Sequence, residues 1–337
     1  MTAILFPDQP SALCPNRMQV YAVTQETPNV WTLSLFTHDR YDYRPGQFAL
    51  VNIGNSGLEQ RAYTLSSTPG VSRFIQLTVK LLPGGCGSTW LTGEVKPGDY
   101  LWLSDAQGEF TADGDRPLVL LAAGCGITPV MSICRDALRR HPARPIQVFY
   151  SIHQPEDMIF AAQWQQLVQQ YPQFKLHILC SQNAQSDMIA GRLSQSLLAQ
   201  HVTDIHSTRV MICGPNDYMQ QAKSWVLALG CTEENIISEA FYTPEPAVNS
   251  EQRLVLTSSQ PLQHFSVKVG ASLLSALEQY SLPVVAACRA GVCGSCKTRI
   301  LSGHYRTTSQ ATLTADELAQ GYVLACSCQL ETDITLA

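Results

Sequence analysis

This sequence contains few charged residues and no excess of basic ones. Of its 337 residues only 15% are charged, and 22 Lys and Arg stand against 27 Asp and Glu, giving a formal net charge of −5. A nucleic-acid-binding protein normally carries a basic excess, so the sequence predicts no nucleic-acid partner. Because 45% of the residues are hydrophobic, a chain of this length can bury more than one core, and we expect several domains.

A long hydrophobic run is also missing. No apolar stretch reaches 18 residues, so we expect no contact with a membrane through a spanning helix. The first residues, MTAILFPDQP, carry no basic segment before their short apolar run, which is not typical of a secretory signal. We therefore expect a cytoplasmic protein. Disulfides then explain its 12 cysteines poorly, and metal binding, catalysis and burial remain.

Turn residues and hydrophobic periods divide the chain into regions. Residues 16–113 alternate short apolar runs with Pro-Gly turns, which predicts an antiparallel β-barrel. In residues 114–243 apolar strands alternate with helices, a pattern typical of a doubly wound parallel sheet. Residues 1–15 are expected to be an N-terminal extension, and the polar, proline-containing residues 244–253 a linker. Residues 254–337 then form a third domain, which contains five of the cysteines.

Four cysteines of that third domain have a diagnostic spacing. Cys288, Cys293, Cys296 and Cys326 follow the pattern C-x4-C-x2-C-x29-C, the plant-type spacing for four thiolates on a [2Fe–2S] cluster. The small residues in CRAGVCGSC let the backbone approach closely and point its N–H groups at sulfur. A structural zinc site is the alternative, although zinc sites usually contain two C-x2-C pairs and this sequence has one. We interpret Cys328 as a non-ligand.

Two segments of the predicted barrel are suited to a flavin. In R-A-Y-T, Arg61 can pair with a pyrophosphate, Tyr63 can cover a ring face, and Thr64 can donate a hydrogen bond near flavin N5. An ordinary strand with a surface Arg explains this tetrapeptide as well. In the later run G-G-C-G-S, Gly87 and Ser88 open the one short helix expected here, whose N-terminal amides can bind a pyrophosphate. A glycine turn with Ser88 as the helix N-cap is a compatible interpretation.

Two loops of the parallel-sheet region are suited to a nicotinamide cofactor. G-C-G-I-T-P, residues 124–129, follows an apolar strand and opens a helix, as dinucleotide-binding loops do. Pro129 stands where the third glycine of G-x-G-x-x-G would be, so a structural turn remains an alternative. Cys213-Gly214-Pro215 ends a later strand, at the sheet edge where ligands bind. Cys213 is then expected to touch the nicotinamide, unless it is a buried core residue.

The order of these motifs resembles the ferredoxin–NADP reductase superfamily with a fused C-terminal plant-type ferredoxin. The resemblance runs from about residue 16 to the end and is particularly to the NADH oxidoreductases that serve the hybrid-cluster protein. It implies an FAD-binding antiparallel β-barrel, a doubly wound nicotinamide domain and a β-grasp ferredoxin domain. It further implies cofactor contacts from Arg61, Tyr63, Thr64, Val79, Lys80, Gly87 and Ser88 to FAD, from Gly124, Gly126, Thr128, Cys213, Gly214 and Pro215 to the nicotinamide, and from Phe241 near the flavin, where a core aromatic is the alternative.

We expect NADH rather than NADPH. An NADPH site places Arg near the 2′-phosphate, and no Arg occurs in S-I-H-Q-P-E-D, residues 151–157, which follows the second strand of the nicotinamide region. The expected path is hydride transfer to the flavin beside Thr64, with Cys213 positioning the nicotinamide, then single electrons to the cluster and to an external redox protein, the hybrid-cluster protein. A reductase component of a mono- or dioxygenase, and a ferredoxin-like redox sensor, remain alternatives.

Overall fold

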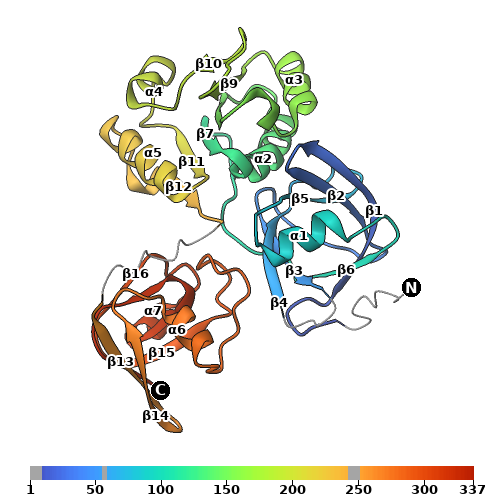
Figure 1. The fold of residues 1–337 in the computed structure, drawn as a ribbon. Helices are drawn as coiled ribbons and strands as arrows, with labels where there is room; N and C mark the ends of the chain where they lie inside the picture. Colours follow the sequence, from blue (N-terminus) through green and yellow to red (C-terminus); the bar gives the residue numbers. More distant parts are fainter. Residues whose placement is uncertain (1–9, 55–58, 242–250) are drawn as a thin grey trace. The chain divides into compact units, whose positions relative to one another are not determined.

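The computed structural model describes residues 10–54, 59–241 and 251–337. These residues form two compact units, shown in Figure 1. The second unit comprises residues 59–61 and 241–337, and the first unit contains the other described residues. In the part of the chain that is described, no helix is both long and apolar enough to cross a membrane.

The first unit, together with residues 59–61 at the start of β4, contains an antiparallel barrel whose strands follow the order β4-β3-β6-β1-β2-β5. A bridge between Leu65 and Leu77 connects the segment after β4 to β5 and closes the barrel. Fully buried Met18, Leu33 and Leu77 fill its interior, and this confirms the predicted antiparallel β-barrel. Its elements are β1 (Asn16–Thr27), β2 (Val30–Phe36), β3 (Phe48–Ile53), β4 (Glu59–Thr64), β5 (Ile75–Lys80), α1 (Cys86–Gly93) and β6 (Tyr100–Leu103).

The rest of the first unit is a parallel sheet of order β10-β9-β8-β7-β11-β12, the predicted doubly wound sheet. Chain order reverses beside β7, so this is the point where a crevice opens at the carboxyl ends of the strands. One face carries α2 and α3 and the other α4 and α5, each over its own buried cluster (Figure 1). The elements are β7 (Leu118–Ala123), α2 (Ile127–Arg140), β8 (Ile146–Ile152), α3 (Ala161–Gln170), β9 (Phe174–Cys180), β10 (Ile189–Ala190), α4 (Gln195–His201), β11 (Arg209–Cys213), α5 (Asn216–Ala228) and β12 (Ile236–Glu239).

The second unit contains a mixed sheet of order β14-β13-β19-β15-β17 and a separate β16-β18 pair. Helix α6 packs on this sheet through buried Leu273 and Leu277, and the arrangement is the predicted β-grasp fold. Its elements are β13 (Arg253–Ser259), β14 (Leu262–Lys268), α6 (Leu273–Gln279), β15 (Lys297–Ser302), β16 (Tyr305–Thr307), α7 (Ala315–Ala319), β17 (Tyr322–Leu324), β18 (Cys328–Leu330) and β19 (Ile334–Leu336).

The predicted extension and linker fall partly outside the described residues. Most of the linker at 244–253 belongs to residues 242–250, which are not described, and Arg253 already begins β13. Of the extension at 1–15, residues 1–9 are not described. Within the remainder, Cys14 is fully buried and its thiol donates to the Leu50 carbonyl at 3.6 Å.

Candidate functional site

The four predicted cluster cysteines lie together in the second unit. The Sγ atoms of Cys296 and Cys326 are 3.4 Å apart, and the thiol of Cys288 contacts those of Cys293 and Cys326. Two thiolates that share one tetrahedral metal at about 2.3 Å bond length lie about 3.8 Å apart, so this separation fits a shared iron. Three of these cysteines are buried, and Cys293 is partly exposed.

Backbone N–H groups of the cysteine loop point at these sulfurs. Ala290 N–H donates to Cys288 Sγ at 3.4 Å, and Gly291 N–H donates to Cys326 Sγ at 3.2 Å. Hydrogen bonds from the thiols of Cys293 and Cys326 are the main cause that holds the pKa of Cys288 far below its ordinary value. At Cys288 this favours the thiolate, which is the form that binds iron, whereas the same hydrogen bonds raise the pKa values of Cys293 and Cys326.

Glycine is required at two positions of this loop. Gly291 and Gly294 have φ angles of +71° and +76°, and a Cβ on Gly291 would lie 2.7 Å from the Ser309 Cβ. The Ser309 hydroxyl donates to the Gly291 carbonyl at 2.6 Å, and the Ser327 hydroxyl donates to the Ser309 carbonyl at 2.9 Å. Ser309 and Ser327 thus fix the loop from two later segments, and glycine at position 291 allows this close approach.

The arrangement of the thiols bears on which metal they hold. Within the described residues, no group of three or more His, Cys, Asp or Glu side chains is placed to hold a single metal ion. The four thiols contact one another in the series Cys293, Cys288, Cys326 and Cys296, and four thiolates are the donor set of a [2Fe–2S] cluster. Cys328 is fully buried in the core of this unit, where burial raises its pKa to about 12, in agreement with its interpretation as a non-ligand.

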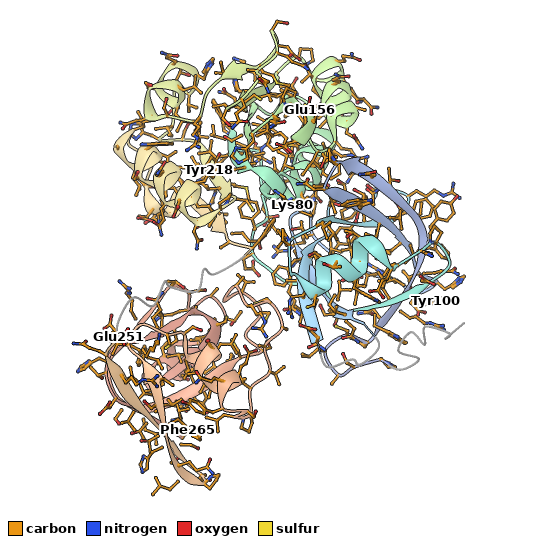
Figure 2. All side chains as sticks on the ribbon, in the orientation of Figure 1. Lys80, Tyr100, Glu156, Tyr218, Glu251 and Phe265 are labelled. Carbon is orange, nitrogen blue, oxygen red and sulfur yellow. The ribbon has the colours of Figure 1, made fainter. Side chains whose placement is uncertain are left out.

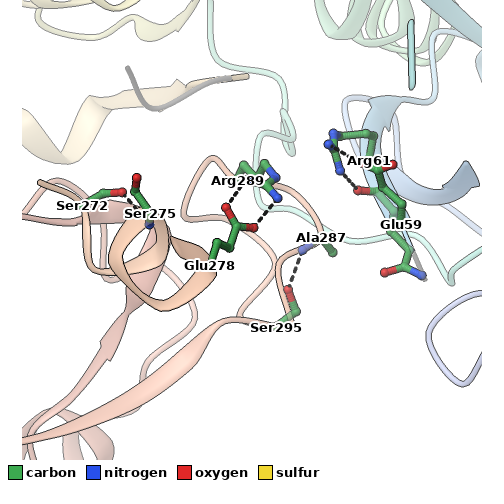
Figure 3. Close-up of polar contacts among 9 residues, drawn as sticks. Glu59, Arg61, Ser272, Ser275, Glu278, Ala287, Arg289 and Ser295 are labelled. Carbon is green, nitrogen blue, oxygen red and sulfur yellow. Dashed lines mark hydrogen bonds and ion pairs between the residues drawn. The ribbon is translucent and has the colours of Figure 1, made fainter. Parts of the chain in front are cut away.

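The barrel strand β4 carries the three predicted flavin residues of R-A-Y-T. Thr64 is buried, and its Oγ1 has no hydrogen-bond partner among the described residues. Leaving a buried hydroxyl unpaired costs about 1–3 kcal/mol. A bound flavin would supply the hydrogen-bond partner that Thr64 Oγ1 lacks among the described residues. Half-buried Tyr63 packs against the barrel core. Arg61 pairs with Glu59 at 2.5 Å and donates to the Gln60 carbonyl (Figure 3), so a pyrophosphate would have to replace Glu59.

The glycine-rich run before α1 differs in detail from its prediction. The N-cap of α1 is Gly85, and Ser88 lies inside the helix, so the interpretation of Ser88 as N-cap is wrong. The Ser88 hydroxyl donates to the Gly85 carbonyl and accepts from Leu82 N–H, both at 3.1 Å, which closes the preceding loop. No side chain caps α1, so its first turn, which includes Gly87, keeps its positive end for an anion.

The two residues predicted on β5 have different surroundings. The side chain of Val79 is buried in the barrel core, so only its backbone can contact a cofactor. Lys80 is exposed and lines a cavity of about 400 Å³ that also involves the parallel sheet. Figure 2 labels Lys80 together with Tyr218, which lines the same cavity from α5. A positive side chain thus extends from the barrel to the nucleotide domain.

This cavity lies at the carboxyl ends of β7, β8, β9 and β11, where the reversal of chain order predicts a ligand. Gly124 and Pro215, both predicted nicotinamide contacts, line it. Ser151 of β8 and Tyr218 of α5 also line it, and burial raises the pKa of Tyr218. Further lining residues that the sequence did not single out are Asn29, Val30, Asp157, Arg192, Asp217 and Trp225.

The other predicted nicotinamide residues shape the loops around the cavity. A Cβ on Gly126 would lie 2.1 Å from the Cys213 carbonyl oxygen, so the two loops are in backbone contact there. A Cβ on Gly214 would meet Ala123 at 3.1 Å. Thr128 is buried, and its hydroxyl donates to the Cys125 carbonyl at 3.0 Å, so it holds the loop. These contacts form the close-packed cradle that a dinucleotide loop requires.

Cys213 and Glu239 are neighbours on adjacent strands, in register between β11 and β12. Cys213 is fully buried, and burial raises the pKa of its thiol well above the ordinary value. Glu239 is 7% exposed, and its Oε2 has no partner among the described residues. Burial raises the pKa of Glu239 to about 8. Glu239 is the one buried residue of β12, and a buried carboxyl is unusual, but a strand pattern alone does not single it out.

Arg192 and Phe241 bear on the predicted nicotinamide and flavin contacts. The preference for NADH used the absence of Arg after β8, but Arg192, which follows β10, lines the cavity. The cavity therefore does contain an arginine, although none occurs in residues 151–157. Phe241 is 41% exposed and belongs to the second unit, and its place near the flavin stays a prediction.

Three family models match the sequence in chain order. The oxidoreductase FAD-binding domain matches residues 18–111, and the oxidoreductase NAD-binding domain matches residues 120–224. The 2Fe-2S iron-sulfur cluster binding domain matches residues 257–331. The chain therefore contains domains for FAD, for a nicotinamide dinucleotide and for a [2Fe–2S] cluster, which confirms the three predicted cofactor classes and favours the cluster over zinc.

Individual proteins resemble the chain over almost its whole length. NADH oxidoreductase HCR of Escherichia coli (strain K12) is 50% identical over 330 residues, which are 97% of this chain and 99% of that protein. The glycine betaine monooxygenase reductase subunit of Chromohalobacter salexigens is 28% identical and covers 90% of each chain. The solved structure of a phthalate dioxygenase reductase has a TM-score of 0.66 at 20% identity, covering 95% of this chain and 97% of that one, and shares the fold.

Proposed function

Because this chain belongs to the family of NADH oxidoreductase HCR, we propose that it passes electrons from NADH through FAD and a [2Fe–2S] cluster to a protein acceptor. FAD accepts a hydride and gives up single electrons, which is the chemistry needed between a two-electron donor and a one-electron cluster. The 50% identity over 97% of the chain supports NADH as the donor.

The observation that carries this proposal is the position of the cavity within the first unit. Asn29, Val30 and Lys80 of the barrel line one part of it, and Gly124 and Pro215 of the nucleotide domain line another. A dinucleotide bound there contacts both the barrel and the parallel sheet. A volume of about 400 Å³ lies in the range typical of small-molecule sites.

Each residue of this site has a proposed task. Gly126 and Gly214 let the two loops approach, and Gly124 and Pro215 border the bound nucleotide. The charge of Lys80 attracts the phosphates of the nucleotide. The remaining contacts are proposed with the roles that the resemblance implies: Arg61, Tyr63, Val79, Gly87, Ser88 and Phe241 toward FAD, and Thr128 toward the nicotinamide loop.

Two residues are proposed to position the reacting groups. The unpaired hydroxyl of Thr64 donates a hydrogen bond to the flavin and orients it. Buried Cys213 forms the floor beneath the nicotinamide through its backbone contact with Gly126. Neither residue needs to exchange a proton, since burial keeps the Cys213 thiol neutral.

The proposed ligands of the cluster are Cys288, Cys293, Cys296 and Cys326. Paired sulfurs and N–H donors from Ala290 and Gly291 support this assignment. The proposed acceptor is the hybrid-cluster protein, in line with the resemblance and the identity to HCR. All 12 cysteines are free, which supports a reducing compartment, and we propose the cytoplasm.

A reductase component of an oxygenase remains the second candidate function, because relatives such as the glycine betaine monooxygenase reductase subunit are 27–29% identical over most of the chain. The two candidates differ in their acceptor and can be separated by one assay. Anaerobic oxidation of NADH is followed with purified hybrid-cluster protein and, in parallel, with a ring-hydroxylating oxygenase component. Saturable acceleration by hybrid-cluster protein alone supports the proposal. Acceleration by the oxygenase component alone assigns the chain to the second function.

A further inference from the structure

One hydroxyl beside the cysteine loop has no hydrogen-bond partner in the part of the chain that the structure describes. Thr312 Oγ1 is buried, and it has no hydrogen-bond partner among the described residues. Neighbouring hydroxyls are all engaged: Ser309 with the Gly291 carbonyl, Ser327 with the Ser309 carbonyl, and Ser295 with Ala287 N–H and Cys293 Sγ. Thr312 therefore differs from these neighbouring serines, whose hydroxyls all form hydrogen bonds.

The hydroxyl of Thr312 is packed on the segment between two proposed ligands. A Cβ built on Gly294 would lie 2.8 Å from Thr312 Oγ1 and 3.2 Å from its Cβ. Gly294 lies between Cys293 and Cys296 and has a φ of +76°. Glycine at this position is what allows the hydroxyl to approach the loop so closely.

The backbone around Thr312 is fixed by local bonds. Leu313 N–H donates to the Gln310 carbonyl at 3.0 Å, and Ala311 N–H donates to Ser309 Oγ at 3.4 Å. The Leu313 side chain also packs against the core of this unit. These contacts hold the backbone of Thr312 in a turn beside the cysteine loop.

We infer that Thr312 donates a hydrogen bond to a sulfur atom of the bound cluster on its Cys293 side and thereby raises the reduction potential of the cluster. A buried hydroxyl left unpaired costs about 1–3 kcal/mol, so an acceptor is expected. The acceptors that a bound cluster brings to this loop are sulfur atoms, whose negative charge increases on reduction. A donor aimed at them stabilises the reduced form.

This inference rests on the proposed cluster and deepens it by naming a residue that tunes it. The test compares the full-length, cluster-loaded protein with Thr312→Val and Thr312→Ser. Valine matches the shape of threonine without the hydroxyl, whereas serine keeps the hydroxyl. Thr308→Val is the matched control, since the Thr308 hydroxyl already bonds to the Ser327 carbonyl at 3.4 Å.

The measurement is a redox titration of the cluster followed by electron paramagnetic resonance, together with iron and sulfide content. Thr312→Val should load normally and titrate at a lower potential, while Thr312→Ser and Thr308→Val should titrate as wild type. The reduced wild-type cluster should also show a coupling to an exchangeable deuteron in D2O that Thr312→Val lacks.

The failures of the two ideas are distinguishable. A wild-type protein that binds no iron and sulfide would overturn the proposed cluster itself. A normally loaded Thr312→Val protein with an unchanged potential and an unchanged deuteron coupling would overturn the hydrogen bond while leaving the cluster in place. Equal shifts in Thr312→Val and Thr308→Val would also contradict it, because they would indicate a general effect of the substitution.

Discussion

Glu278, at the end of α6, forms a two-point ion pair with Arg289 in the cysteine loop (Figure 3). Arg289 follows Cys288 directly and has a φ of +55°, a conformation that a long side chain rarely adopts. The ion pair holds this residue in place, so that the next two N–H groups, of Ala290 and Gly291, point at cysteine sulfurs.

Loss of this pair should loosen the cluster. Glu278→Gln removes the charge that holds Arg289, and we expect faster loss of iron during dialysis against a chelator. Asp42→Asn, which breaks the exposed Arg40–Asp42 pair of the barrel, is the control and should lose iron as wild type does. Identical iron loss in all three proteins would show that the pair does not support the loop.

An added methyl group at Gly126 should disrupt the nucleotide site. Its Cβ would lie 2.1 Å from the Cys213 carbonyl oxygen, so the loops must separate. We expect Gly126→Ala to cost about 1–3 kcal/mol of stability and to raise the KM for NADH at least about tenfold. Gly93→Ala is the control, because nothing lies within 4 Å of its added Cβ. An unchanged KM for NADH in Gly126→Ala would contradict a role of the Gly126 loop in binding the nucleotide.

The hydroxyl of Thr64 should matter for the rate of flavin reduction. Thr64→Val keeps the shape and removes the unpaired hydroxyl, and we expect a fall of about tenfold, or about 1.4 kcal/mol, in the rate. Stopped-flow absorbance at the flavin band after mixing with NADH measures it. Thr64→Ser should restore most of the rate. Equal rates for Thr64→Val and wild type, with flavin bound in both, would contradict a contact with the cofactor.

The buried carboxyl of Glu239 predicts how stability depends on pH. Its pKa rises from 4.5 to about 8 on folding, so the folded chain keeps a proton that the unfolded chain releases. The stabilisation is therefore complete below about pH 4.5 and is lost as pH rises to about 8. As the pH rises from about 4.5 to about 8, the melting temperature of Glu239→Gln should fall less than that of the wild-type protein. Parallel curves would show that Glu239 is ionised in the folded protein.

Continuous apolar runs made the parallel strands easy to predict. Strands β7, β8 and β9 coincide with the apolar runs LVLLAA, IQVFYSI and FKLHILC, and most of their residues are buried. The cysteine spacing likewise predicted which thiols meet, since a metal cluster constrains ligand positions more tightly than a core constrains its residues.

Other features depend on contacts that the sequence does not display. Strand β10 has two residues, and only its pairing with β9 places the following Arg192 at the cavity. Strand β13 was placed partly in the linker, because Arg253 follows a polar, proline-containing stretch. Burial of Glu239 and of the Thr312 hydroxyl comes from tertiary packing, and it cannot be predicted from the sequence because polar residues are usually exposed.

The most direct test of the account is to remove one cluster ligand and measure two electron transfers. Cys293→Ser is assayed anaerobically for reduction of ferricyanide by NADH, which needs only the flavin, and for reduction of the protein acceptor, which needs the cluster. The account predicts that ferricyanide reduction stays close to wild type and that transfer to the acceptor is lost. Survival of both activities would contradict the path from NADH through FAD and the cluster.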